Sequence, residues 1–254
     1  MKKTNLPFIP ERSEKPRDNG LTMIMDKGLS IREAEDLMQV GSEYIDYVKL
    51  GFGTSVFTQG TKEKIKIFKQ ANVRTYLGGT LFEAYLVRDM FSDYRKLLED
   101  LGLDTLEISD GSYEMDPKKK LECIRVLEKD FYVLSEVGSK KKDVVYSPAE
   151  WVDMMVSELE EGSVKVIAEA RESGTTGIYN DDGSANIELI NKMSEEVGFN
   201  NIIWEAPLKS QQVWFIKQFG ANVNLGNIAP NEIIALETLR NGLRGDTFFQ
   251  FLPK

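Results

Sequence analysis

Histidine is absent from this 254-residue chain, and cysteine occurs once. The absence of histidine excludes Ser-His-Asp and Cys-His catalysis, zinc held by histidine, and a histidine general base. Acid–base chemistry must therefore use lysine, glutamate, aspartate, tyrosine or water. A metal site must be built from oxygen atoms, which suits a hard ion such as Mg²⁺. The lone Cys123 cannot form an internal disulfide, and its helically spaced apolar neighbours favour a small buried side chain over a nucleophile.

The chain also lacks long apolar runs and an excess of basic residues. No run approaches the ~20 apolar residues of a membrane span, and residues 1–7 lack the apolar middle of a signal peptide. Together with the scarcity of cysteine, this leads us to expect a cytoplasmic protein with no membrane partner. A net charge of −9 disfavours nucleic acid as a partner. Small anionic substrates remain compatible, because exposed charges are screened beyond roughly 8 Å.

A short apolar run that ends in a charged or glycine-rich cluster, followed by a helix-like stretch, recurs along the chain. The runs predict strands at residues 21–25, 44–50, 73–77, 105–109, 131–136, 164–168, 201–204 and 221–225. Helices are expected at residues 30–40, 62–70, 82–101 and 184–197, and from residues 116, 147, 210 and 230. Alternation with short loops indicates a parallel sheet, and eight such units predict a closed (β/α)₈ TIM barrel.

An open doubly wound sheet is the main alternative to the barrel. It would carry a glycine-rich phosphate loop after its first strand, and residues 26–28 make a poor one. We therefore expect one catalytic barrel domain over residues 21–254. Residues 1–20 are polar and interrupted by proline, and we expect them to form an N-terminal arm.

Barrels of this class carry their active sites at the carboxyl ends of the strands. The charged and polar groups expected there are Asp26, Lys49, Glu107, Asp110, Glu136, Lys140, Lys141, Glu169, Arg171, Glu172, Glu205, Lys209 and Asn224. Four glutamates come at comparable positions of four successive units: Glu107, Glu136, Glu169 and Glu205. Burial would raise the cost of their mutual repulsion. We expect a divalent cation, helped by basic side chains, to neutralise them. Salt bridges alone are the alternative.

Other residues at the same ends suit an anionic substrate. Lys49 ends a strongly apolar strand, where a lysine is costly unless it is paired. Arg171 and Ser173 lie in a loop rich in hydroxyls and glycine, a composition that suits phosphate, sulfonate or carboxylate. Asn224 and Gly226 precede the start of the last helix, a common phosphate-binding position. We expect these five residues to bind the substrate.

Several of these stretches match a known family in order and spacing. They are residues 49–54, 107–111, 136–138, 169–174, 204–207 and 222–228. Together they resemble the phosphosulfolactate synthase family. The resemblance implies a (β/α)₈ barrel that joins sulfite to phosphoenolpyruvate with Mg²⁺, a carbon–sulfur lyase-type synthase. In methanogens the family serves coenzyme M synthesis, and in spore-forming bacilli a member is associated with sulfolactate production.

The resemblance also implies roles for particular residues. The family's proposed acid is a lysine just after the Glu-Val-Gly stretch. Ser139 intervenes here, so Lys140 and Lys141 are both candidates for the group that protonates the enolate-like intermediate. For the metal we expect Glu107, Glu136 and Glu169 as ligands, with Glu205 in reserve.

Two other functions remain open at this stage. In the first, the barrel is an aldolase-like enzyme whose Lys49 forms a Schiff base with a carbonyl substrate. In the second, it is a non-catalytic sensor of a phosphorylated ligand or a structural protein of spores. The crowded charges at the strand ends argue against the second, since they destabilise a barrel that has no chemistry to perform. We expect a homo-oligomer, because barrels of this kind often associate.

Overall fold

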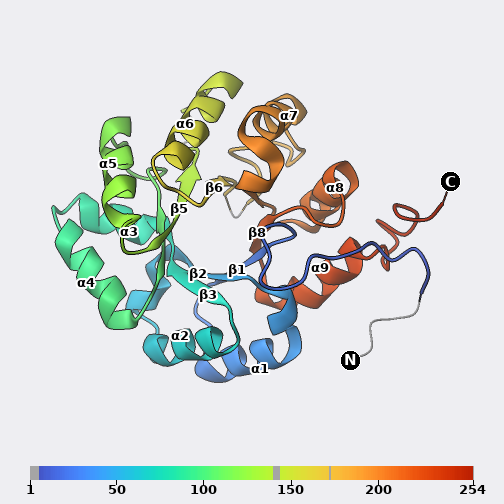
Figure 1. The fold of residues 1–254 in the computed structure, drawn as a ribbon, viewed down its shortest axis with the longest axis horizontal. Coiled ribbons are helices and arrows are strands. Elements are labelled where there is room, and N and C mark those ends of the chain that lie inside the picture. The colour runs from blue at the N-terminus through green and yellow to red at the C-terminus, as the bar shows by residue number, and fades with distance from the viewer. Residues whose placement is uncertain (1–5, 140–143, 172, 254) are drawn as a thin grey trace.

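The computed structural model describes residues 6–139, 144–171 and 173–253, and it confirms the expected (β/α)₈ TIM barrel. Eight parallel strands stand in the order β3-β2-β1-β8-β7-β6-β5-β4, in the middle of the molecule with the helices around them (Figure 1). The strands are β1 (Thr22–Asp26), β2 (Tyr47–Leu50), β3 (Arg74–Leu77), β4 (Thr105–Ile108), β5 (Tyr132–Val137), β6 (Lys165–Ala168), β7 (Ile202–Glu205) and β8 (Leu225–Ile228). At the remaining seam, Arg74 Nη1 donates to Thr105 Oγ1 at 3.2 Å, so β3 and β4 lie side by side.

Two helices begin at the capping residues that the sequence predicts. Ser30 caps α1 in a capping box with Glu33, and Ser147 caps α6 in the same way with Glu150. The α-helices are α1 (Ile31–Gly41), α2 (Thr61–Gln70), α3 (Gly79–Leu86), α4 (Phe91–Leu101), α5 (Pro117–Leu127), α6 (Pro148–Glu160), α7 (Ile187–Met193), α8 (Lys209–Phe219) and α9 (Ile233–Arg240). Short helical turns are η1 (Ser42–Tyr44), η2 (Gly51–Val56), η3 (Ser194–Gly198), η4 (Phe199–Asn201) and η5 (Pro230–Glu232). None of the helices in the described part of the chain combines the length and apolar character that crossing a membrane requires.

Several predicted elements have shifted bounds: β2 begins at Tyr47 and not at residue 44, and α7 begins at Ile187 and not at residue 184. Two differ more. The helix expected over residues 82–101 is two helices, α3 and α4, because Asp89 adopts a left-handed φ of 57° that a right-handed helix cannot continue through. The last strand was expected at residues 221–225, but β8 is Leu225–Ile228. The preceding residues form a turn in which Val223 N donates to Gly220 O. This shift moves the whole carboxyl end of the last strand three residues along the chain.

Apolar side chains fill both the barrel and the layer between strands and helices. The interior of the barrel holds one cluster: Leu21, Met23, Tyr47, Tyr76, Leu134, Ile167 and Ile203. A larger cluster lies between the strands and the surrounding helices, and it includes Val48, Leu50, Val133, Val166 and Ile202. Residues of one strand therefore alternate between the two clusters, as the period of two in a β-strand requires.

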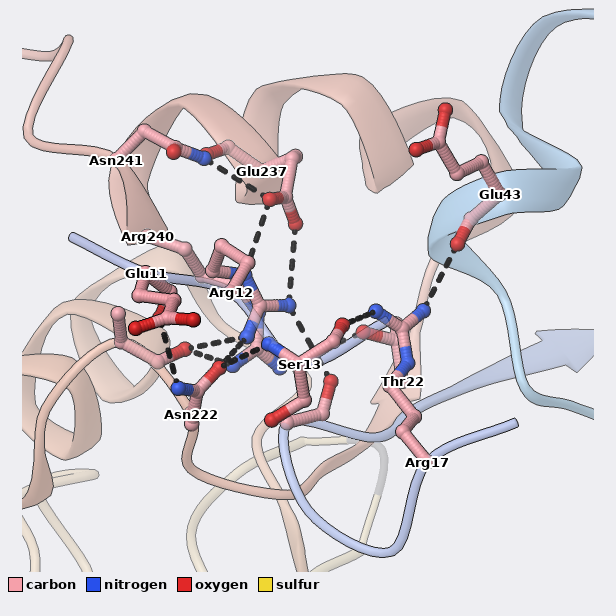
Figure 2. A network of polar contacts seen from close by, with 12 residues as sticks. Glu11, Arg12, Ser13, Arg17, Thr22, Glu43, Asn222, Glu237, Arg240 and Asn241 are labelled. Carbon is pink, nitrogen blue, oxygen red and sulfur yellow. Dashed lines mark hydrogen bonds and ion pairs between the residues drawn. The ribbon is translucent and has the colours of Figure 1, made fainter. Parts of the chain in front are cut away.

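The described part of the N-terminal arm, residues 6–20, packs against the amino ends of the strands, where it passes beside α9 (Figure 1). Arg12 Nε donates to Glu237 Oε1 of α9 at 3.0 Å, and Arg12 Nη1 donates to Ala221 O at 3.0 Å and to Asn222 Oδ1 (Figure 2). Arg240, fully buried, donates to the same Ala221 carbonyl at 2.7 Å. This part of the arm thus lies at the end of the barrel opposite to the carboxyl ends of the strands.

Candidate active site at the carboxyl ends of the strands

A cavity of about 630 Å³ opens at the carboxyl ends of the strands. Six of the residues singled out from the sequence line it: Lys49, Glu136, Glu169, Arg171, Ser173 and Glu205. They come from β2, β5, β7 and the residues that follow β6. The structure therefore brings together side chains that are far apart in the chain, as the convergence of parallel strand ends requires.

The alternation of each strand explains why these side chains point inward. On four strands, the charged residue lies two positions after an apolar residue of the interior cluster. The pairs are Tyr47 and Lys49, Leu134 and Glu136, Ile167 and Glu169, and Ile203 and Glu205. Residues two apart share one face of a strand or its extension, so each charged side chain lies above an apolar one, nearer the cavity. The charged side chains form the floor of the cavity, and the apolar layer lies beneath them inside the barrel.

Lys49 lies at the centre of this charged layer. Its Nζ is 2.7 Å from Glu136 Oε2, 2.9 Å from Glu107 Oε2 and 3.4 Å from Glu205 Oε1. The Lys49 side chain is only 7 % exposed. Burial alone would lower the pKa of Lys49, but the carboxylates of Glu107, Glu136 and Glu205 outweigh it and raise that pKa well above its ordinary value. Lys49 therefore stays protonated, as an internal counter-ion.

Three buried carboxylates could hold a metal ion. Oxygens of Glu136, Glu169 and Glu205 lie within 4.8 Å of one another. A set of carboxylate oxygens suits a hard cation such as Mg²⁺, so the residues present fit the ion that the sequence predicts. Among the described residues, this group includes Glu205 and not Glu107. Glu107 instead accepts a hydrogen bond from Gly79 N at 2.6 Å through Oε1 and contacts Lys49 through Oε2.

The pKa of Glu205 is raised toward neutral pH. Burial raises its pKa to about 7, against the opposing effect of Lys49, and the nearby charge of Glu136 raises it further. One oxygen of Glu205 accepts from Ala170 N at 2.8 Å, and its own carbonyl accepts from Tyr179 at 2.7 Å. These contacts hold both the side chain and the backbone of Glu205 in place at the cavity floor.

Basic and hydroxyl groups lie around the rim of the same cavity. Arg171 and Ser173 line it, as expected, and so does Lys27, which sequence reasoning missed. Lys27 Nζ lies 5.9 Å from the centre of the Phe52 ring. Its neighbour Asp26 was a candidate for chemistry but has a structural role: Asp26 Oδ2 is 2.6 Å from the buried Lys64.

The sequence did carry one signal for Lys27. Asp26 Oδ1 also accepts from Gly28 N and Leu29 N, both at 2.7 Å, and so fixes a tight turn directly after β1. Gly28 adopts a φ of 119° in this turn, which favours glycine. An Asp-Lys-Gly turn at a strand end therefore presents its middle residue to the cavity. Phe52, Thr80, Ser112 and Asn227 also line the cavity and were not singled out from the sequence.

Two predicted substrate-binding residues have other positions. Asn224 precedes β8 and is fully buried at the opposite, amino-terminal end of the barrel. Its Oδ1 accepts from Leu21 N at 3.1 Å and its Nδ2 donates to Ile202 O at 3.1 Å. Gly226 lies inside β8, where an added Cβ would be 2.7 Å from Met23 Cε. The prediction of a rim position is wrong for Asn224, because the last strand begins later than its apolar run indicated. Gly226 pairs with Glu205 in the β7–β8 ladder and does not itself line the cavity.

Asp110 and Lys209, two further candidates from the sequence, form ion pairs and do not line the cavity. Asp110 is paired with the buried Lys120 at 2.8 Å, and Lys209 with Asp246 at 3.0 Å. Lys140, Lys141 and Glu172 lie outside the described residues.

Comparison with known proteins agrees with this architecture. The profile of the family described as (2R)-phospho-3-sulfolactate synthase (ComA) matches residues 10–246. A phosphosulfolactate synthase of Methanothermobacter thermautotrophicus is 44% identical over 246 residues, which cover 94% of this chain and 95% of the relative. A phosphosulfolactate synthase of Bacillus subtilis is 41% identical over 244 residues, which cover 95% of this chain and 97% of the relative.

A likeness to a solved structure concerns the fold alone. The 3-hexulose-6-phosphate synthase of Salmonella typhimurium superposes with a TM-score of 0.57 at 15% identity, over 88% of this chain and 100% of that one. The sequence likeness is of a different order, since it extends through the strand ends that line the cavity. This chain belongs to the (2R)-phospho-3-sulfolactate synthase family of enzymes.

Proposed function

We propose that this enzyme adds sulfite to phosphoenolpyruvate to give phosphosulfolactate. The sulfur lone pair of sulfite forms a bond to the methylene carbon of phosphoenolpyruvate. The electron pair of the carbon–carbon double bond moves toward the carboxylate, and a proton is then added at the neighbouring carbon. No bond to phosphate breaks, so the ester is retained. The observation that carries the proposal is a cavity whose floor holds clustered carboxylates and whose rim holds cations.

The cluster of Glu136, Glu169 and Glu205 would hold Mg²⁺. When bound, Mg²⁺ supplies a Lewis acid that stabilises negative charge developing on a substrate carboxylate. Lys49 keeps the carboxylate cluster oriented, because its ammonium contacts Glu136 and Glu205 from below. Without these cations, the cavity would repel both substrates.

Rim residues bind the anionic ends of the substrates in this proposal. Arg171 offers a planar fork of donors that suits phosphate, sulfonate or carboxylate, and Ser173 adds a hydroxyl. Lys27 adds a flexible cation on the β1 side of the cavity. For the proton donor we keep the residues predicted from the sequence, Lys140 or Lys141. Lys49 is a poor substitute, because three carboxylates hold its proton.

The same reasoning disfavours the Schiff-base alternative. A lysine attacks a carbonyl only as the neutral amine, and Schiff-base lysines are activated by a lowered pKa. The pKa of Lys49 is raised because burial, which would lower it, is outweighed by Glu107, Glu136 and Glu205. Borohydride treatment in the presence of a carbonyl substrate should therefore leave the mass of the protein unchanged.

The test of the proposal is direct. Purified protein should be mixed with phosphoenolpyruvate, sulfite and Mg²⁺, and phosphorus NMR should show the phosphoenolpyruvate resonance replaced by that of a new phosphate ester. Omitting sulfite serves as the control for hydrolysis. If no new ester resonance forms across a range of pH and metal concentration, the proposed reaction is wrong.

A further inference from the structure

Lys120, on the inner face of α5, makes contacts that the reaction as proposed does not use. It is only 3 % exposed, yet it lies outside the cavity. Lys120 Nζ donates to Glu136 O at 2.8 Å and to Asp110 Oδ1 at 2.8 Å, and it lies 2.7 Å from Glu158 Oε1. An ammonium has three N–H donors, so these three acceptors account for all of them.

The contact with Glu136 O lies where two neighbouring strands end at different levels. The ladder between β4 and β5 ends with Ile108 opposite Ser135, whereas β5 continues to Val137. Beyond Ile108 the chain of β4 turns away, and Asp110 of that turn is the residue that Lys120 pairs with. The last part of β5 thus lacks a β4 neighbour in the ladder.

The direction of the β5 carbonyls shows that the Glu136 carbonyl lacks a backbone hydrogen bond from β4. Val133 O accepts from Val164 N, and Val137 O accepts from Glu169 N, both on the β6 side. Carbonyls of successive residues in a strand point to opposite sides, so Glu136 O faces β4. A β4 amide would bond there if the strand continued. The Lys120 ammonium takes the place of that amide.

We propose that Lys120 is a positioning residue that holds the backbone of Glu136, and through it the Glu136 carboxylate, at the cavity floor. Glu136 Oε2 is the atom 2.7 Å from Lys49, and the same side chain belongs to the carboxylate cluster with Glu169 and Glu205. The inference rests on the proposed function only for its effect on metal binding and rate. The holding of the strand end is a separate property that can be measured without any ligand.

Asp110 and Glu158 make the contact selective for a cation. Glu158 comes from α6 and is 3 % exposed, so its carboxylate needs a charged partner more than a neutral one. Asp110 comes from the loop after β4. One ammonium therefore ties this loop, the end of β5 and α6 to one another, and a neutral side chain at position 120 would leave two carboxylates uncompensated.

The variants must therefore remove the charges of Asp110 and Glu158 together with that of Lys120. Lys120→Met alone risks misfolding, so it should be combined with Asp110→Asn and Glu158→Gln, which remove both uncompensated charges while keeping side-chain size. The matched control is Lys165→Met. Lys165 is also a largely buried lysine that donates to a backbone carbonyl, Asn200 O at 2.9 Å, but it lies at the amino end of β6.

Three measurements on the full-length variants test the proposal. Hydrogen exchange in the segment Tyr132–Val137 should be at least tenfold faster in the triple variant than in the parent protein. Binding of Mn²⁺, followed by electron paramagnetic resonance, should weaken at least tenfold. The kcat should fall at least tenfold, with a smaller change in KM for phosphoenolpyruvate. Lys165→Met should leave all three near the parent values.

The outcomes separate this inference from the proposed function. Unchanged exchange in the triple variant would overturn it whatever the enzyme catalyses. Faster exchange with parental Mn²⁺ affinity and kcat would also overturn it, since Lys120 would then serve stability alone. If the parent protein binds no Mn²⁺ and forms no phosphosulfolactate, the proposed function fails, and hydrogen exchange still decides whether Lys120 holds the strand end.

Discussion

The ammonium of Lys49 and Oε2 of Glu136 lie 2.7 Å apart in the floor of the cavity. Lys49 shares its charge with Glu107 and Glu205 as well, at 2.9 Å and 3.4 Å. One cation therefore faces three buried carboxylates, and Glu169 adds a fourth acid within reach of Glu136 and Glu205. Among the residues that the structure describes, these four acids outnumber the single lysine they surround, which is the physical argument for the divalent ion that we propose.

Replacing Lys49 by methionine tests this balance of charge. The side chain keeps its length but leaves its carboxylates without a counter-ion, so we expect a loss of about 3–5 kcal/mol in the free energy of unfolding at pH 8. The loss should shrink at pH 5, where the carboxylates can take up protons. Urea unfolding at both pH values measures it, and Lys49→Arg is the charge-keeping control. An equal loss at both pH values would contradict the role of Lys49 as a counter-ion.

Glu205 should make the stability of the metal-free protein fall as the pH rises. Burial raises its pKa from an ordinary 4.5 to about 7, so the folded protein binds this proton more tightly than the unfolded chain does. The resulting stabilisation is fully present below about pH 4.5 and is lost as the pH rises through about 7.

We therefore expect the free energy of unfolding to decrease between pH 5 and pH 8 in the presence of chelator, and Glu205→Gln to reduce that decrease. Urea unfolding across this range provides the measurement. The prediction is wrong if parent and variant show the same pH dependence.

Mg²⁺ should stabilise the protein through Glu136, Glu169 and Glu205. A ligand at a hundred times its dissociation constant adds about 2.7 kcal/mol to the stability of the folded state. We expect Mg²⁺ to raise the melting temperature of the parent protein and of Glu107→Gln, and to have little effect on Glu169→Gln or Glu205→Gln. Chelator should abolish turnover in the parent. If Mg²⁺ stabilises Glu205→Gln but not Glu107→Gln, the ligands are instead Glu107, Glu136 and Glu169, as expected from the sequence.

Gly177 should be intolerant of a side chain. Its φ is 73°, and an added Cβ would overlap the carbonyl oxygen of Glu169. We expect Gly177→Ala to displace Glu169 and to lower kcat at least tenfold. Gly102 is the matched control, because its φ is 71° but the space around it is open. Gly102→Ala should cost about 1 kcal/mol of stability and leave kcat unchanged. Similar kinetics in the two variants would show that Glu169 is not held through this contact.

Arg12 should matter for stability and not for catalysis. It joins the N-terminal arm to Glu237 and Asn222 at the amino ends of the strands, opposite the cavity (Figure 2). We expect Arg12→Ala to cost about 2 kcal/mol, since hydrogen bonds to a charged partner are lost. Thermal unfolding measures this loss, and steady-state kinetics should show unaltered kcat and KM. Arg95→Ala, which removes two exposed ion pairs, is the control that should change neither stability nor kinetics.

Much of the fold and part of the site could be read from the order of residues along the chain. Apolar runs that end in charged residues located the strand ends, and parallel strands in a barrel bring those ends to one rim whatever their separation in sequence. That is why Lys49, Glu136, Glu169 and Glu205 were predicted together. Their spacing of two residues from an interior apolar side chain was also present in the sequence, because the inward face of a strand repeats every second residue.

What the pattern could not supply was contact between segments remote in sequence. The apolar run before β8 does not reveal that Asn224 bonds across to Leu21 and Ile202, so it misplaced the strand end. The sequence pattern also does not show that Glu107 contacts Gly79 and Lys49, whereas Glu205 belongs to the carboxylate cluster. Local periodicity sets which face of a strand a side chain occupies. Which charge it meets there depends on distances between strands, and these exist only after the barrel has closed.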